Sequence, residues 1–136
     1  MAQVIRGREH PYYEAPGEFR RFGKFLLSPG RIADAPVTIG QFIYPPGARS
    51  HAHRHAFATE VYCCTAGELE AVVEGRPHRL QAGDLLLISP GEEHYCANPG
   101  TEEMRFLAVH TPPVSDYDEF TLSWQERDPE TGCAGV

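Results

Sequence analysis

The chain has 136 residues, enough for one domain with a sizeable core. Its net charge of −7 argues against a nucleic-acid partner, and its longest purely aliphatic run, residues 85–88, is far too short to span a membrane. The N-terminal residues have no apolar run of the kind found in secretory signals. We therefore expect a cytoplasmic domain that binds neither nucleic acid nor a membrane.

Twelve prolines and thirteen glycines are spread along the chain, which favours many short elements joined by turns. Residues 1–20 are expected to form an irregular arm or an edge strand. Apolar, β-branched or alternating segments between turn residues then predict strands at 21–27, 37–44, 60–65, 68–74, 78–80, 85–88, 94–97 and 104–110. The segment 85–88 is expected to be buried.

No helical apolar period occurs before residue 114. Short strands at near-regular spacing, with Gly and Pro turns between them, predict one all-β domain over residues 21–113, either a sandwich or a barrel. The tail 114–136 is mostly polar, but Phe120, Leu122 and Trp124 alternate. They predict a short strand or lid that packs on or near the barrel.

Residues 47–67 contain a histidine-rich stretch, in which His51, His53 and His55 stand at alternate positions and Glu60 follows. Alternate side chains of an extended segment share one face, so two of these imidazoles can point at one centre. A carboxylate shortly downstream can return to that centre after a bend. Imidazole and carboxylate together suit Fe, Mn, Ni, Cu or Zn. The alternative is an exposed strand edge that happens to be rich in histidine.

A second stretch, 83–98, adds His94 just past a turn, and the two stretches together resemble the two motifs of the cupin superfamily. The first motif is Gly, five residues, His-x-His, three or four residues, Glu, six residues and Gly, matched here by Gly47, His53, His55, Glu60 and Gly67. The second is Gly, five residues, Pro-x-Gly, two residues, His, three residues and Asn. Its counterparts are Gly83, Gly91, His94 and Asn98, with Ser89 in place of the first proline.

This resemblance implies a small single-domain cupin, a jelly-roll-like barrel built as a double-stranded β-helix. It implies one divalent transition metal held by His53, His55, Glu60 and His94, with Fe(II) favoured and Mn, Ni, Zn or Cu as alternatives. His51 falls in the variable loop before the ligands, at the rim of the pocket or in solvent. Each ligand imidazole needs an acceptor for its other ring nitrogen, and Gln41 and Glu68 are candidates.

Strand alternation adds candidates for the pocket wall. If Glu60 faces inward, so do Tyr62 and Cys64, and if His94 faces inward, so does Cys96. Tyr62 and Cys96 are thus candidates for substrate binding. The alternative for both thiols is a role as small core hydrophobes.

Four further candidates come from the last predicted strand and from the residues that flank the first motif. Phe106 and His110 share one face of the last strand, where Phe106 would contact substrate. His110 is either a general base at the pocket mouth or the capped end of a strand. Tyr44 and Arg49 flank the first motif and are candidates for binding a substrate carboxylate.

Three function classes follow from the resemblance. The favoured one is a dioxygenase acting on a small organic substrate in the barrel. The first alternative is a metal-dependent isomerase, lyase or cyclase that does not use O2, and the second is a ligand-binding module without turnover. A homodimer is expected, because small cupins commonly associate through an edge strand, and the N-terminal arm is one segment that could provide it.

Overall fold

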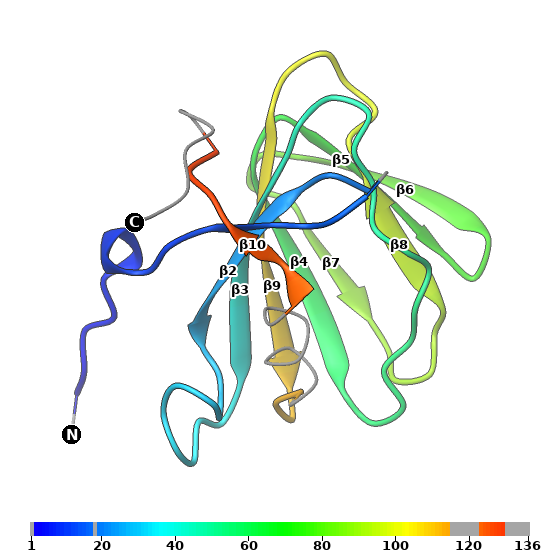
Figure 1. The fold of residues 1–136 in the computed structure, drawn as a ribbon. Coiled ribbons are helices and arrows are strands. Elements are labelled where there is room, and N and C mark those ends of the chain that lie inside the picture. Colours follow the sequence, from blue (N-terminus) through cyan, green and yellow to red (C-terminus); the bar gives the residue numbers. More distant parts are fainter. Residues whose placement is uncertain (1, 18, 115–122, 130–136) are drawn as a thin grey trace.

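Two antiparallel sheets face each other in the computed structural model, which describes residues 2–17, 19–114 and 123–129 (Figure 1). The larger sheet has the strand order β10-β1-β2-β3-β9-β4-β7, and the smaller one has the order β6-β5-β8. The elements are η1 (Gly7–Glu9), β1 (Tyr13–Glu14), β2 (Phe22–Leu27), β3 (Thr38–Tyr44), β4 (Thr59–Ala66), β5 (Glu68–Val73), β6 (Arg76–Gln81), β7 (Leu85–Ile88), β8 (His94–Ala97), β9 (Met104–Thr111) and β10 (Gln125–Glu126).

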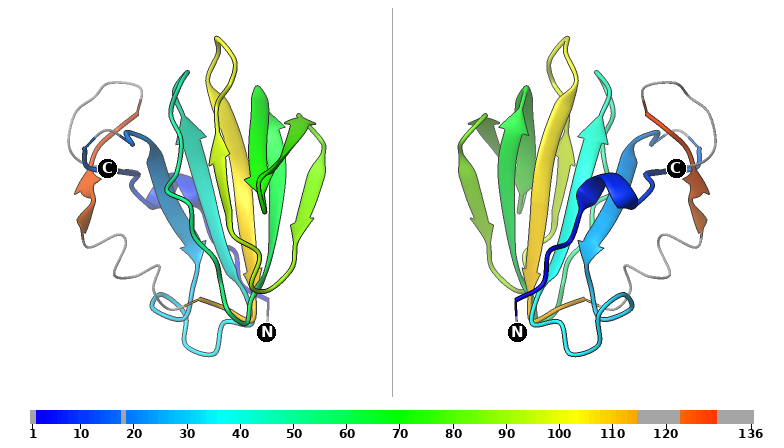
Figure 2. Two further views of the ribbon diagram at one scale, coloured as in Figure 1. Left: turned by 90° about the vertical axis from the view of Figure 1, so that its right-hand side faces the viewer. Right: turned by 90° about the vertical axis from the view of Figure 1, so that its left-hand side faces the viewer.

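The strands bury alternate side chains between the sheets. In β9, Met104, Phe106, Ala108 and His110 are at most 2% exposed, while the residues between them are half-buried. This period of two is expected for a strand with one face on the core. Figure 2 shows the sheets from two sides, with η1 and β10 next to β2 and away from β5 and β6. The core therefore runs between the central strands, where the site is built.

Motif residues that carry no ligand atom shape the backbone around the site. Gly67 has a φ of +72°, and a Cβ atom there would lie 2.5 Å from the carbonyl oxygen of Glu103, so only glycine fits. Asn98 is 3% exposed, and its amide nitrogen donates to the carbonyl oxygens of Tyr44 (2.9 Å) and Glu102 (2.7 Å). Both residues fix turns that set the register of the neighbouring strands.

The eight predicted strands are all present, with ends within about two residues of the expected ones. The prediction that 85–88 is buried is wrong. Leu85 and Leu87 are 66% and 68% exposed, whereas Ile88 is buried. The reason is that side chains alternate along a strand, and Leu85 and Leu87 lie on the face of the sheet that points away from the core. As an edge strand, paired only with β4 among the described residues, β7 also has no neighbour on its other side to cover them.

The N-terminal arm packs on the chain's own larger sheet. Within it, β1 pairs with β2 on one side and with β10 on the other. Trp124, just before β10, is 8% exposed, while Phe120 and Leu122 lie outside the described residues. None of the described helical segments has the length and apolar character needed to cross a membrane.

Candidate metal centre

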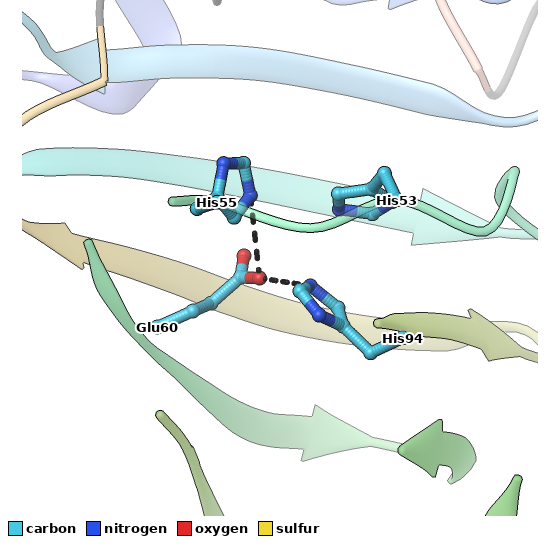
Figure 3. Close-up of side chains that lie close together, drawn as sticks. All are labelled: His53, His55, Glu60 and His94. Atoms are coloured by element: carbon cyan, nitrogen blue, oxygen red, sulfur yellow. Dashed lines mark hydrogen bonds and ion pairs between the residues drawn. The ribbon is translucent and has the colours of Figure 1, made fainter. Parts of the chain in front are cut away.

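Three separate segments bring His53, His55, Glu60 and His94 together, and we call these four residues the donor cluster. His53 and His55 come from the loop after β3, Glu60 from β4 and His94 from the start of β8 (Figure 3). One potential ligand atom from each residue lies within 4.8 Å of the corresponding atoms of the others. The spacing of the histidines and the glutamate in the sequence therefore corresponds to a real cluster in space.

Backbone hydrogen bonds hold the histidine loop against β8. The amide of His53 donates to the carbonyl of His94 (2.9 Å), and the amide of His94 donates to the carbonyl of His53 (2.8 Å). The amide of Gly91 donates to the carbonyl of His55 (2.8 Å). Gly91 has a φ of +84°, which explains the glycine in the second motif. The two motifs are thus joined through main-chain atoms.

Local carbonyl groups orient two of the imidazoles. Nδ1 of His53 lies 2.8 Å from the carbonyl oxygen of His51, and Nδ1 of His94 lies 2.9 Å from that of Glu92. When each Nδ1–H donates to its carbonyl, Nε2 is the ring nitrogen left for the cluster. The predicted acceptors are not used here, since the Glu68 carboxylate instead pairs with Arg79 (3.4 Å). Gln41 has its side chain beside Gly7 instead.

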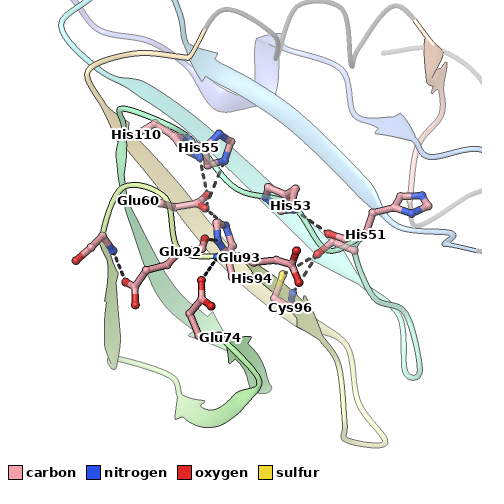
Figure 4. Close-up of polar contacts among 12 residues, drawn as sticks. His51, His53, His55, Glu60, Glu74, Glu92, Glu93, His94, Cys96 and His110 are labelled. Carbon is pink, nitrogen blue, oxygen red and sulfur yellow. Dashed lines mark hydrogen bonds and ion pairs between the residues drawn. The ribbon is translucent and has the colours of Figure 1, made fainter.

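Glu60 is the buried anion of the cluster. It is 2% exposed, and its Oε1 and Oε2 atoms each lie 2.6 Å from a histidine Nε2, that of His94 and that of His110 respectively (Figure 4). Burial alone would raise the pKa of Glu60, but the hydrogen bonds from His110 and His94 outweigh it and lower the pKa to about 2. For His94, the lowering by burial is outweighed by Glu60, which raises its pKa.

His55 shows that the cluster fits a metal ion. Its Nε2 atom is buried without a hydrogen-bond partner and lies 3.7 Å from Oε1 of Glu60. Burial lowers the pKa of His55 to about 4, so the imidazole is neutral at pH 7. A buried polar atom without a partner is costly in a folded protein, and a metal ion bound here would satisfy it. Three imidazoles and a carboxylate are donors that divalent transition metals accept.

A cavity of about 260 Å³ opens directly on the donor cluster. Aromatic side chains form much of its wall: the Phe42 and Phe106 rings stack at 5.2 Å, and Tyr44 and Tyr62 meet Phe106 edge-on at 5.2 Å and 5.3 Å. Tyr44, Tyr62, Cys96 and Phe106 all line the cavity, as their proposed contact with substrate requires. His51 lies at its exposed rim, with its ring 3.9 Å from that of Phe19.

The structure does not place Arg49 in the cavity. Arg49 is exposed, and its guanidinium lies over the rings of Phe19 (5.4 Å) and Tyr95 (4.8 Å). The buried cation in the wall is instead Arg21, which is 4% exposed. Sequence reasoning missed Arg21, although alternation from the core residue Phe25 along the first long strand would have turned it inward.

His110 and Cys64 each had two expected roles, and the packing decides between them. The prediction of His110 at the pocket mouth is wrong, because its imidazole is fully buried against Glu60. Cys64 faces inward as alternation predicts, but it does not line the cavity. Its sulfur lies 3.7 Å from the carbonyl oxygens of both Ala66 and Gly67, and burial raises its pKa. Cys64 is therefore a core residue.

Comparisons with known proteins agree with this geometry. Residues 40–110 match the family described as the Cupin domain. The chain is 31% identical over 125 residues to protein SchB of Streptomyces halstedii, covering 90% of each chain. It is 30% identical over 114 residues to L-ectoine synthase of Alkalilimnicola ehrlichii, covering 83% of this chain and 81% of that one.

The fold is also found among solved structures. A "predicted oxalate decarboxylase" from Thermotoga maritima superposes with a TM-score of 0.72 at 25% identity. The superposition covers 81% of this chain and 99% of the other. These matches confirm the double-stranded β-helix expected from the sequence.

Proposed function

Because the chain belongs to the cupin family, we propose that it is a metal-dependent enzyme acting on a small organic substrate, with the metal as a Lewis acid and without oxidation. One observation carries this proposal: His53, His55 and Glu60 themselves line the cavity. A molecule bound in the cavity would therefore meet the metal directly. The names of two similar proteins support an enzymatic role, since one is called L-ectoine synthase and the other a "predicted oxalate decarboxylase".

A metal bound by the donor cluster would polarise a carbonyl or related oxygen of the substrate. The protein's own part is to place that oxygen. The rings of Phe42, Tyr62 and Phe106 form an apolar wall that positions a flat substrate and keeps water away. Burial raises the pKa of Tyr44 well above its usual value, so its hydroxyl stays neutral and can act as a hydrogen-bond donor to substrate.

A dioxygenase is the second candidate, because the donor set is also compatible with it. Histidine and carboxylate ligands are also those of non-haem Fe(II) oxygenases, so Fe(II) would suit this cluster. The two reactions differ in what they consume. An oxygenase takes up O2 and adds oxygen atoms to its product, whereas a Lewis-acid isomerase, lyase or cyclase needs no O2.

Metal analysis and turnover under controlled oxygen test both candidates. We expect about one transition-metal ion per chain in the purified protein and in Glu68→Gln, whose carboxylate is exposed, and loss of the ion in Glu60→Gln. Candidate substrates are then compared in air and under argon, with product masses measured. Equal turnover without added oxygen supports the Lewis-acid enzyme. Oxygen-dependent turnover with oxygen in the product would establish the dioxygenase instead. Stoichiometric ligand binding without any product would overturn both in favour of a binding module.

A further inference from the structure

The cavity has a second polar region beyond the donor cluster, formed by Arg21, Tyr44, Ser50 and Cys96, which we call the distal polar group. Cys96 follows His94 by two residues on β8 and faces the same way, so the group begins about 7 Å further along that strand. The amide of Cys96 donates to Oγ of Ser50 (3.0 Å), and the Cys96 thiol lies 3.4 Å from the Tyr44 hydroxyl.

Arg21 brings a permanent positive charge to this region. It is 4% exposed, its guanidinium lies 4.9 Å from the centre of the Trp124 ring, and Nη1 donates to the carbonyl of Phe19 (2.8 Å). Arginine does not lose its proton near neutral pH, so this end of the cavity carries a positive charge. An anion bound in the cavity would lie beside that charge.

The charge of Arg21 reaches the neighbouring hydroxyl of Tyr44. Burial raises the pKa of Tyr44, and the charge of Arg21 works against this rise. The positive charge of Arg21 would likewise attract an anion bound at this end of the cavity. It could also accept hydrogen bonds from the hydroxyls of Tyr44 and Ser50, which the structure places on the same wall.

We propose that the substrate is a flat organic acid whose carboxylate binds Arg21, Tyr44 and Ser50 while its other end reaches the donor cluster. The Phe42 and Phe106 rings lie on the wall of the same cavity and provide a surface for an apolar body. This inference rests on the proposed function for the identity of the reacting end, but the anion site itself depends only on the distal polar group. The guanidinium fork matches a carboxylate in shape as well as in charge.

The test compares two probes of the same shape, naphthalene-2-carboxylate and naphthalene-2-carboxamide, by calorimetric titration of the metal-loaded full chain. We expect Arg21→Gln to weaken binding of the carboxylate about tenfold or more, with little effect on the carboxamide. Arg49→Gln is the matched control, since Arg49 lies outside the cavity. It should leave both affinities unchanged.

Two milder variants keep the test decisive if Arg21→Gln does not fold. Arg21→Lys retains the charge and should lose only part of the carboxylate affinity, whereas Tyr44→Phe should weaken the carboxylate severalfold and spare the carboxamide. Unchanged carboxylate affinity in these variants, or equal losses for both probes, would overturn the proposal. So would carboxylate binding that disappears on metal removal but survives Arg21→Gln. A chain that binds no metal yet binds the carboxylate through Arg21 would refute the proposed function alone.

Discussion

Nε2 of His110 lies 2.6 Å from Oε2 of Glu60, with both side chains buried, while the other carboxylate oxygen faces His94 and His55. His110 thereby fixes which oxygen of Glu60 is presented to the donor cluster. It acts on the site through Glu60, as a positioning residue beneath the cavity.

We therefore expect His110→Ala to weaken metal binding by about 10–100-fold, because the carboxylate loses the partner that orients it. The free energy of unfolding should also fall by about 2–3 kcal/mol, because a buried carboxylate oxygen is left without its donor. Competitive titration with a metal-sensitive dye measures the first effect, and urea denaturation measures the second. His78→Ala, at an exposed position on β6, is the control. Full metal affinity in His110→Ala would show that Glu60 is oriented without it.

Acid should destabilise the metal-free protein in two steps. The pKa of His55 is about 4 when folded and 6.5 when unfolded, so between these pH values only the unfolded chain binds the proton and stability falls as pH falls. One such proton gives a slope of about 1.4 kcal/mol per pH unit. Glu60, with a pKa of about 2 against 4.5, continues the loss below pH 4.5.

His94 has the opposite sign, because its pKa is raised in the folded protein. Its contribution is complete below pH 6.5 and is lost as pH rises through the folded value. The metal-free chain should therefore be most stable near pH 6.5 with respect to these histidines. Thermal melting in EDTA across pH tests this, with Glu60→Gln removing the step below pH 4.5. A melting temperature that stays flat between pH 4 and 6.5 would contradict the assignment of His55.

Cys96 should behave as an inert wall residue. Burial raises the pKa of this thiol to about 11, so it is protonated at pH 7 and is a poor nucleophile and a poor metal ligand. We expect Cys96→Ser to retain one metal ion per chain, and native Cys96 to react with iodoacetamide far more slowly than in the unfolded chain. Metal analysis and peptide mass spectrometry are the measurements. Loss of metal in the serine variant would show that the sulfur of Cys96 is an additional metal ligand.

The edge strand β7 suggests how a homodimer would form. It combines exposed Leu85 and Leu87 with backbone groups that no other described strand pairs, and such edges favour association with a second copy. We expect the double variant Leu85→Glu, Leu87→Glu to be monomeric in light scattering where the parent chain is dimeric. Val4→Glu, at another exposed apolar position, should leave the dimer intact. A parent chain that is monomeric at high concentration would exclude this interface.

Much of the fold could be predicted because turns and alternation are local. The strand ends follow Gly, Pro and Asn. The alternate spacing of His53 and His55, with Glu60 after a bend, indicates a shared centre, and the resemblance to the two cupin motifs adds the fourth donor. The errors arise where a residue's exposure depends on its position in the sheet and not on its neighbours in sequence. Four consecutive apolar residues around Leu86 look buried on both faces, yet only one face of this strand packs on the core. Arg49 is next to the motif in sequence but outside the cavity, whereas Arg21 reaches it through pairing of β2 with β3.

The main-chain bonds between His53 and His94, and between Gly91 and His55, have a consequence for redesign. They hold the loop in place without using any ligand side chain. The loop held by these main-chain bonds should therefore keep its conformation when residues of the donor cluster are replaced, as in His55→Cys or Glu60→Asp. A library restricted to these four positions could retune the preference of this barrel among metal ions while leaving its architecture alone.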